Sequence, residues 1–283
     1  MSLKNKISKM LPAFIMRRLI RIRDRRSLAA VPSQDCPVEC LWKRSADELA
    51  ALFRDPVADH AWQQVAQQLE GFEIPDMTGG VNPGDRRAIF YLVRTTGALT
   101  VLEVGTHIGA STCHLAAAIG QTVSELSASG PRLVSVDVEA INDPERRPWR
   151  QYGAPYSPEE LVTKLGCSEF VSFRQEKSLE YLASGEQMFD VIFLDGDHSA
   201  QTTYQEIPLA LSRLKPGGVI LLHDYFPGGQ PLWSNGVAIS GPYLAVERLK
   251  REGALLDVIP LGELPWPTKL GSRKTSLAVL VSR

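Results

Sequence analysis

The sequence lacks the features that mark several protein classes. No run approaches the roughly 20 consecutive apolar residues of a membrane-spanning helix, and no internal repeat is visible. Cysteine occurs only four times in 283 residues, at Cys36, Cys40, Cys113 and Cys167. One CxxxC pair without a second pair or nearby histidines is weak evidence for zinc, and four scattered thiols are typical of a protein in a reducing cytosol. With 44% hydrophobic residues, the composition indicates a soluble enzyme with one large domain and an appendage.

The net charge of −1 conceals a strong asymmetry along the chain. Residues 1–26 carry nine Lys or Arg against Asp24 alone, so this segment is +8 and the remainder is −9. Apolar residues recur within it at helical spacing, namely Ile7, Leu11, Phe14, Ile15, Leu19 and Ile22. We expect a basic amphipathic helix on an anionic membrane surface, a helix packed on its own domain or on a partner subunit of a homo-oligomer, or a disordered segment.

The same segment does not resemble a signal peptide. Its apolar core is short, contains Pro12 and leads into arginines without a cleavage site. The expected localisation is therefore cytoplasmic, with contact at the inner membrane surface if residues 1–26 bind lipid. The acidic remainder argues against a nucleic-acid partner, because a duplex would be repelled.

The pattern of helices and strands predicts two regions. Residues 1–75 form an α-helical extension, with one helix starting at Ser45, where Glu48 completes a capping box, and another over 57–69. Residues 76–283 open with a helix over 85–94 and then alternate. The predicted elements are strand 101–104, helix 110–119, strand 133–137, helix 158–165, strand 170–174, helix 178–183, strand 190–194, helix 201–214, strand 218–222, helix 242–252 and an antiparallel hairpin of strands 255–261 and 276–281. Such alternation predicts an α/β protein, with a mostly parallel, doubly wound sheet covered on both faces.

The segment VLEVGTHIGAST, residues 101–112, reads as a buried strand, a glycine turn and a helix start. Gly105 and Gly109 allow a tight turn beside a ligand, and the helix start offers free backbone N–H groups. A dinucleotide fingerprint would need glycine at 105, 107 and 110, but the chain has His107 and Ala110. A nucleotide-like cofactor other than NAD is favoured over a strand-turn-helix unit without a ligand.

The other predicted strand ends are acidic. They carry Asp137 after the second strand, Asp195, Asp197 and His198 after the fourth, and His223 and Asp224 after the fifth. Ligands of open α/β sheets bind outside these carboxyl ends. Carboxylates from adjacent strands repel one another unless a proton or a cation lies between them, and oxygen-rich sites suit Mg²⁺, Mn²⁺ or Ca²⁺.

The motif E-x-G-x-x-x-G-x-S at residues 103–111 resembles motif I of the class I S-adenosylmethionine (SAM) methyltransferases, in the form of the catechol and caffeoyl-CoA O-methyltransferases. The resemblance implies a seven-stranded sheet with a reversed last strand. It also implies that Glu103, Gly105 and Ser111 line the methionine end of SAM, with His107 and Gly109 in the turn. Asp137 would bind the ribose, and Ser178 would contact the adenine amine or instead cap its helix.

The acidic strand ends also resemble those of the macrocin O-methyltransferase group. The resemblance implies a divalent metal, Mg²⁺ or Mn²⁺, on Asp195, His223 and Asp224, with Asp195 also beside the cofactor. His223 departs from the pattern, because those groups have a carboxylate there. Imidazole is a poor Mg²⁺ ligand and a better one for Mn²⁺, Fe²⁺ or Zn²⁺, so His223 binds a softer metal or acts as a base in a metal-free site. The catalytic base would be Asp197, then His198, then His223.

Two segments exceed what the fold needs and could recognise the substrate. Residues 141–156 combine three arginines (Arg146, Arg147, Arg150) with Trp149, Tyr152 and Tyr156, and the loop 225–241 carries Phe226 and Trp233. The sequence therefore predicts a SAM-dependent O-methyltransferase acting on a hydroxyl of a small molecule, such as a sugar or a natural-product intermediate. The alternatives are a metal-independent methyltransferase with a His or Asp base, an NAD-linked oxidoreductase, and a non-catalytic SAM-binding scaffold.

Overall fold

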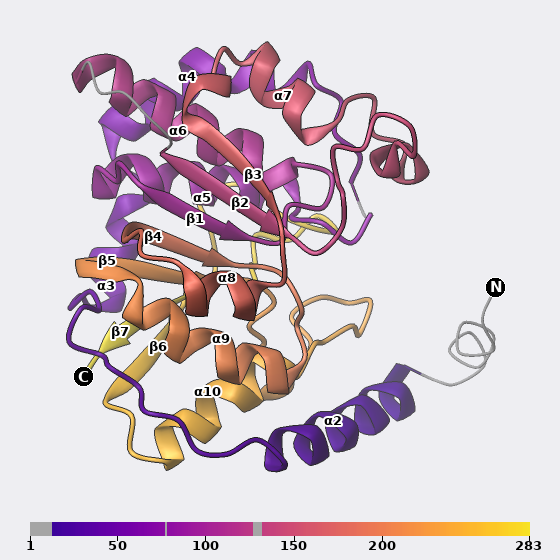
Figure 1. The fold of residues 1–283 in the computed structure, drawn as a ribbon, viewed down its shortest axis with the longest axis vertical. Helices are drawn as coiled ribbons and strands as arrows, with labels where there is room; N and C mark the ends of the chain where they lie inside the picture. Colours follow the sequence, from indigo (N-terminus) through magenta and orange to yellow (C-terminus); the bar gives the residue numbers. More distant parts are fainter. Residues whose placement is uncertain (1–12, 77, 127–131) are drawn as a thin grey trace.

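A computed structural model of the chain describes residues 13–76, 78–126 and 132–283. Across these residues one seven-stranded sheet has the order β3-β2-β1-β4-β5-β7-β6 (Figure 1). The strands are β1 (Val101–Val104), β2 (Leu133–Asp137), β3 (Val171–Gln175), β4 (Phe189–Leu194), β5 (Leu214–Leu222), β6 (Leu256–Pro260) and β7 (Ala278–Ser282). The first five are parallel to their neighbours, whereas β7 runs antiparallel to both β5 and β6. The predicted α/β fold with a reversed last strand is confirmed.

The central strands are buried on both faces because helices cover each side of the sheet. One face is covered by α3 (Ala46–Leu52), α4 (Pro56–Glu70), α5 (Pro83–Thr96), α6 (Ala110–Leu126) and α7 (Pro158–Lys164), which share a core with Val101 and Phe193. The opposite face packs against α8 (Ser178–Ser184), α9 (Ala200–Ser212) and α10 (Gly241–Arg251), in a second core with Leu102 and Ile192. Alternate residues of each strand thus enter different cores, and this arrangement leaves the carboxyl ends of the strands open for a ligand.

The helix N-termini follow local signals. Ser45 and Glu48 form the predicted capping box of α3, and Ser157 and Glu160 form a second one at α7. Most predicted boundaries agree with the structure to within two residues, and the larger differences are at α6 and β5. Helix α6 continues to Leu126, past the predicted end at residue 119, and β5 begins at Leu214 rather than at 218.

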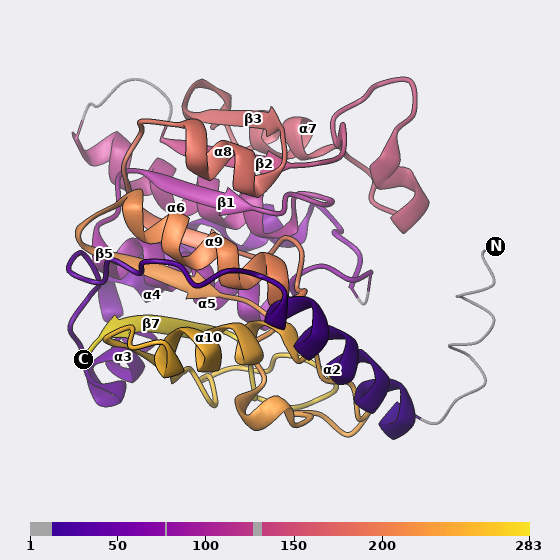
Figure 2. The ribbon, with the colours of Figure 1, turned by 60° about the horizontal axis from the view of Figure 1, so that its bottom comes forward.

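The basic segment forms a helix where it is described. Helix α2 (Ala13–Ala29) lies along α9 and α10 at the edge of the molecule (Figures 1 and 2). Its Asp24 is buried and accepts a hydrogen bond from Ser240 at 2.8 Å, and Leu28 enters the core of that face. The predicted packing of this helix on its own domain is thus observed. The predicted apolar positions Ile7 and Leu11 lie outside the described residues.

None of the described helices combines the length and the apolar character needed to cross a bilayer. All four cysteines are free.

The cap of α7 supports the glycine turn, because Pro158 packs beneath Gly109. We expect Ser157→Ala to lower the free energy of unfolding by about 1 kcal/mol, since it removes a buried N-cap. Ser212→Ala at the exposed end of α9 is the control and should change stability by less than about 0.5 kcal/mol. Urea denaturation of the two variants tests this, and equal stabilities would contradict it.

Candidate active site

The glycine turn is packed directly against the end of β4. At Gly105, whose φ is +96°, an added methyl group would lie 2.3 Å from the carbonyl oxygen of Asp195. At Gly109, whose φ is +77°, it would lie 2.9 Å from the Cα atom of Pro158. Both positions therefore need glycine for space as well as for backbone conformation. His107 adopts φ = 50° between them.

Glu103 lies beneath the turn and is fully buried. Its carboxylate accepts hydrogen bonds from Ser111 at 2.5 Å, Thr112 at 2.6 Å and Ser135 at 2.5 Å. Burial raises the pKa of Glu103 to about 7, although these hydroxyls favour the charged form. Neither Glu103 nor Ser111 lines the cavity above the turn. In this structure both residues hold β1, β2 and α6 together.

Asp137 connects the end of β2 to the turn and also lines the cavity. Its Oδ2 accepts from the backbone N–H groups of Thr106 at 3.0 Å and His107 at 2.9 Å, and its Oδ1 accepts from Glu139 at 2.9 Å. A carboxylate has about four lone-pair sites, so one acceptor site remains for a ligand hydroxyl.

A cavity of about 700 Å³ opens at the carboxyl ends of β1, β2 and β4. It is lined by Gly79, Gly80, Val104, Gly105, His107, Val136, Asp137, Val138, Glu176, Lys177, Ser178, Leu179, Glu180, Asp195, Gly196, Asp197, His198 and Thr202. The predicted Ser178 lies on this wall, and the N-cap of α8 is Lys177 rather than Ser178. Five carboxylates against one lysine suit a cationic sulfonium, so the residues present fit SAM.

Beside this cavity, the ends of β4 and β5 bring together two carboxylates and two imidazoles. His223 Nδ1 lies 2.6 Å from Asp195 Oδ1 and 3.8 Å from Asp224 Oδ1. His198 Nε2 lies 3.6 Å from Asp224 Oδ2 and 3.8 Å from Asp195 Oδ1. Asp195, His198 and His223 each offer one possible ligand atom, and these three atoms lie within 4.8 Å of one another. These three residues could hold one metal ion.

The buried His223 supports this interpretation. Despite the short distance to Asp195, its Nδ1 lacks a partner in hydrogen-bond geometry. Burial alone would lower the pKa of His223, but the nearby charges of Asp195 and Asp224 raise it well above the ordinary value. A positive charge is thus favoured between these carboxylates, as a proton or as a cation.

The structure also shows which residues the sequence did not single out. The fully buried Asp85 at the start of α5 lies 3.6 Å from His223 Nε2, and its Oδ1 has no hydrogen-bond partner. His198 enters the group around the metal candidate, although it was expected only as a base. No sequence spacing relates residue 85 to residue 223, because only the packing of α5 under the sheet brings them together. The inclusion of His198 could have been predicted, because it lies three residues after Asp195 in the DGDH motif.

Asp197 lies on the cavity wall and holds the start of α9. Its Oδ1 accepts from the backbone N–H of Ser199 at 2.9 Å, and its Oδ2 accepts from the hydroxyl groups of Ser199 at 3.2 Å and Thr202 at 2.8 Å. The carboxylate is therefore fixed in place at the edge of the cavity.

The two segments expected to recognise substrate differ in exposure. Tyr152 is 37% exposed, and its ring packs edge-on against the His107 ring with 4.3 Å between the ring centroids. Residues 141–156 therefore contact the glycine turn. Trp149 in the same segment is buried. In the loop 225–241, Phe226 and Trp233 are buried and pack against each other with 5.8 Å between their ring centroids.

Comparisons with known proteins agree with this geometry. Residues 102–225, which contain the glycine turn and all the β4 and β5 site residues, match the methyltransferase domain family. A protein of Mycobacterium sp. (strain JLS), provisionally named as an O-methyltransferase, is 28% identical over 188 residues, which are 65% of this chain and 76% of that protein. These similarities support a SAM-dependent O-methyltransferase.

Solved structures show the same fold. An O-methyltransferase from Bacillus cereus in complex with SAH gives a TM-score of 0.52 at 21% identity, covering 84% of this chain and 100% of that one. The O-methyltransferase TomG from Streptomyces achromogenes, which is involved in tomaymycin synthesis, was solved in complex with SAM. It gives a TM-score of 0.50 at 20% identity, and the match covers 81% of this chain and 90% of that one.

The cavity predicts a sharp steric test of cofactor binding. Gly105→Ala should abolish measurable SAM binding, because its methyl group meets the Asp195 carbonyl oxygen at 2.3 Å. Gly253→Ala is a matched control, since Gly253 has a similar φ of +101°, no atom within 4 Å of the added methyl group, and a position outside the cavity lining. Titration calorimetry with SAM separates the two. Equal losses would mean that backbone strain, not the clash, accounts for the effect.

The buried Glu103 predicts a pH dependence of stability. Its pKa is raised from 4.5 to about 7, so the folded state holds the proton more tightly than the unfolded state. Its contribution to stability is present below pH 4.5 and is lost as the pH rises toward 7. This loss in the free energy of unfolding is on the order of 3 kcal/mol. Urea denaturation at pH 4.5 and at pH 7 measures it, and in the Glu103→Gln variant this difference between the two pH values should be absent.

Burial also raises the pKa of Glu206 on α9 to about 7, so it provides an independent comparison. Glu206→Gln should remove a separate part of the same pH dependence. A slope that neither substitution changes would contradict the assignment.

Proposed function

We propose that this methyltransferase transfers the methyl group of SAM to a hydroxyl of a small molecule, assisted by a divalent cation. The observation that carries the proposal is the group formed by Asp195, His198 and His223 beside the cofactor cavity. Two imidazoles and one carboxylate favour Mn²⁺, Fe²⁺ or Zn²⁺ over Mg²⁺. Asp224 adds a further negative charge 3.6 Å from His198.

In the proposed reaction, different residues bind the cation, accept the proton and position the cofactor. The bound cation would lower the pKa of the acceptor hydroxyl. Asp195, His198 and His223 hold the cation, and Asp85 lies against the far side of His223, where a carboxylate commonly orients a ligand imidazole. Asp197, on the cavity wall and outside this group, takes the hydroxyl proton. Gly105 and Asp137 position the cofactor.

The acceptor is a sugar or a natural-product intermediate. Support comes from the exposed Tyr152 and the arginines of residues 141–156, which suit an anionic group beside a flat ring or a sugar face. TomG, which has the same fold, is involved in tomaymycin synthesis, and this supports a natural-product acceptor.

The metal is tested by binding and by activity. Asp195→Ala and His198→Ala should each weaken Mn²⁺ binding at least about tenfold in titration calorimetry, whereas Asp47→Ala, an exposed acid on α3, should not. Formation of SAH with a panel of hydroxylated compounds should stop in EDTA and return with Mn²⁺. Full activity in EDTA would instead support a metal-independent methyltransferase with a His or Asp base.

A further inference from the structure

The outer face of α2 has no role in methyl transfer, yet its composition is unusual. Leu19 is 50% exposed and Ile22 is 40% exposed, and with Ile15 they form one stripe at positions i, i+4 and i+7. Exposed arginines flank this stripe, at Arg18, Arg23, Arg25 and Arg26. Apolar residues in water beside several cations are typical of a helix that lies at a membrane surface.

The opposite face of α2 fixes the orientation of the helix. Asp24 accepts the hydrogen bond from Ser240, and Arg17 donates to the carbonyl of Gly236. Arg248 on α10 donates to the carbonyl groups of Leu28 and, at 2.6 Å, of Val31. The Leu19 and Ile22 stripe therefore faces away from the domain and cannot be buried by a rotation of the helix that keeps these bonds.

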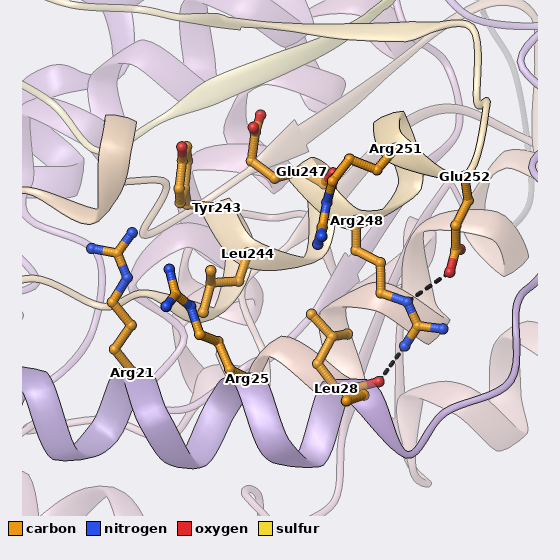
Figure 3. A pocket seen from close by; sticks show the side chains of 10 residues that line it. Arg21, Arg25, Leu28, Tyr243, Leu244, Glu247, Arg248, Arg251 and Glu252 are labelled. Atoms are coloured by element: carbon orange, nitrogen blue, oxygen red, sulfur yellow. Dashed lines mark hydrogen bonds and ion pairs between the residues drawn. The ribbon is translucent and has the colours of Figure 1, made fainter.

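A cavity of about 650 Å³ lies between α2 and α10, beside the stripe (Figure 3). Arg21 and Arg25 reach into it from α2, and Arg251 reaches into it from α10. Arg248 is paired with Glu252 at 2.8 Å, and Glu247, the other carboxylate of the lining, points away from α2 in Figure 3. The buried Nε of Arg21 has no hydrogen-bond partner. The cavity thus carries a net positive charge and an unused buried donor, which suit a phosphate.

We propose that α2 docks this protein onto a lipid bilayer that contains anionic lipids. Leu19 and Ile22 enter the boundary between headgroups and acyl chains, while Arg18, Arg25 and Arg26 contact phosphates and the cavity holds one lipid headgroup. Charge repulsion decides against the pairing of two α2 helices from two copies of the chain, because the exposed face carries four arginines and the one carboxylate among the described residues of α2, Asp24, is buried.

Vesicle sedimentation of the full chain tests the proposal. The protein should sediment with vesicles of phosphatidylcholine and phosphatidylglycerol and remain in solution with phosphatidylcholine alone. The double substitution of Leu19→Ser and Ile22→Ser should abolish sedimentation, and Arg18→Gln and Arg25→Gln should each lower the partition coefficient roughly fivefold. Arg251→Gln should also lower it, because it removes a cation from the headgroup cavity.

Matched substitutions elsewhere are the controls. Val57→Ser with Leu270→Ser exchanges two apolar residues that are more exposed than Leu19 and Ile22, and Arg54→Gln removes an exposed arginine outside α2. All three should leave sedimentation unchanged. The proposal is overturned if inorganic phosphate binds the wild type while anionic vesicles do not, or if the α2 substitutions dissociate a dimer that never binds vesicles.

Discussion

The buried carboxylate of Glu103 is the interaction on which the site depends. It joins a strand, the neighbouring strand and the first turn of α6 through hydroxyl groups of Ser135, Ser111 and Thr112. Losing a partner would leave a buried polar group unsatisfied, at a cost of about 1–3 kcal/mol. The glycine turn can remain open to a ligand because these hydrogen bonds hold β1, β2 and α6 together beneath it.

Much of the fold could be predicted from the sequence because it follows local rules. The alternation of apolar strands with helices, the capping box at Ser45 and the glycines at 105 and 109 each depend on neighbours in the chain. The larger errors occurred at the ends of elements. Helix α6 continues to Leu126, beyond the predicted end at residue 119.

The site was predictable to the extent that it lies at strand ends. Asp195 and His223 lie together because β4 and β5 are adjacent and parallel, whereas the group that could hold a metal includes His198 in place of the predicted Asp224. The contact of Asp85 with His223 was not predictable, since it depends on how α5 packs beneath the sheet. Glu103 and Ser111 belong to the recognised motif, yet they are buried below the cavity. A motif identifies which residues are constrained, and the structure shows whether they face the ligand or support the residues that do.

The position of Asp195 has a consequence for the reaction. Its backbone N–H bonds to Val104 at 2.9 Å, its carbonyl oxygen packs on Gly105, and its side chain lies 2.6 Å from His223. One residue therefore belongs both to the cofactor cavity and to the group beside it. In the proposed reaction, a single residue would therefore connect the site of the methyl donor to the site of the acceptor.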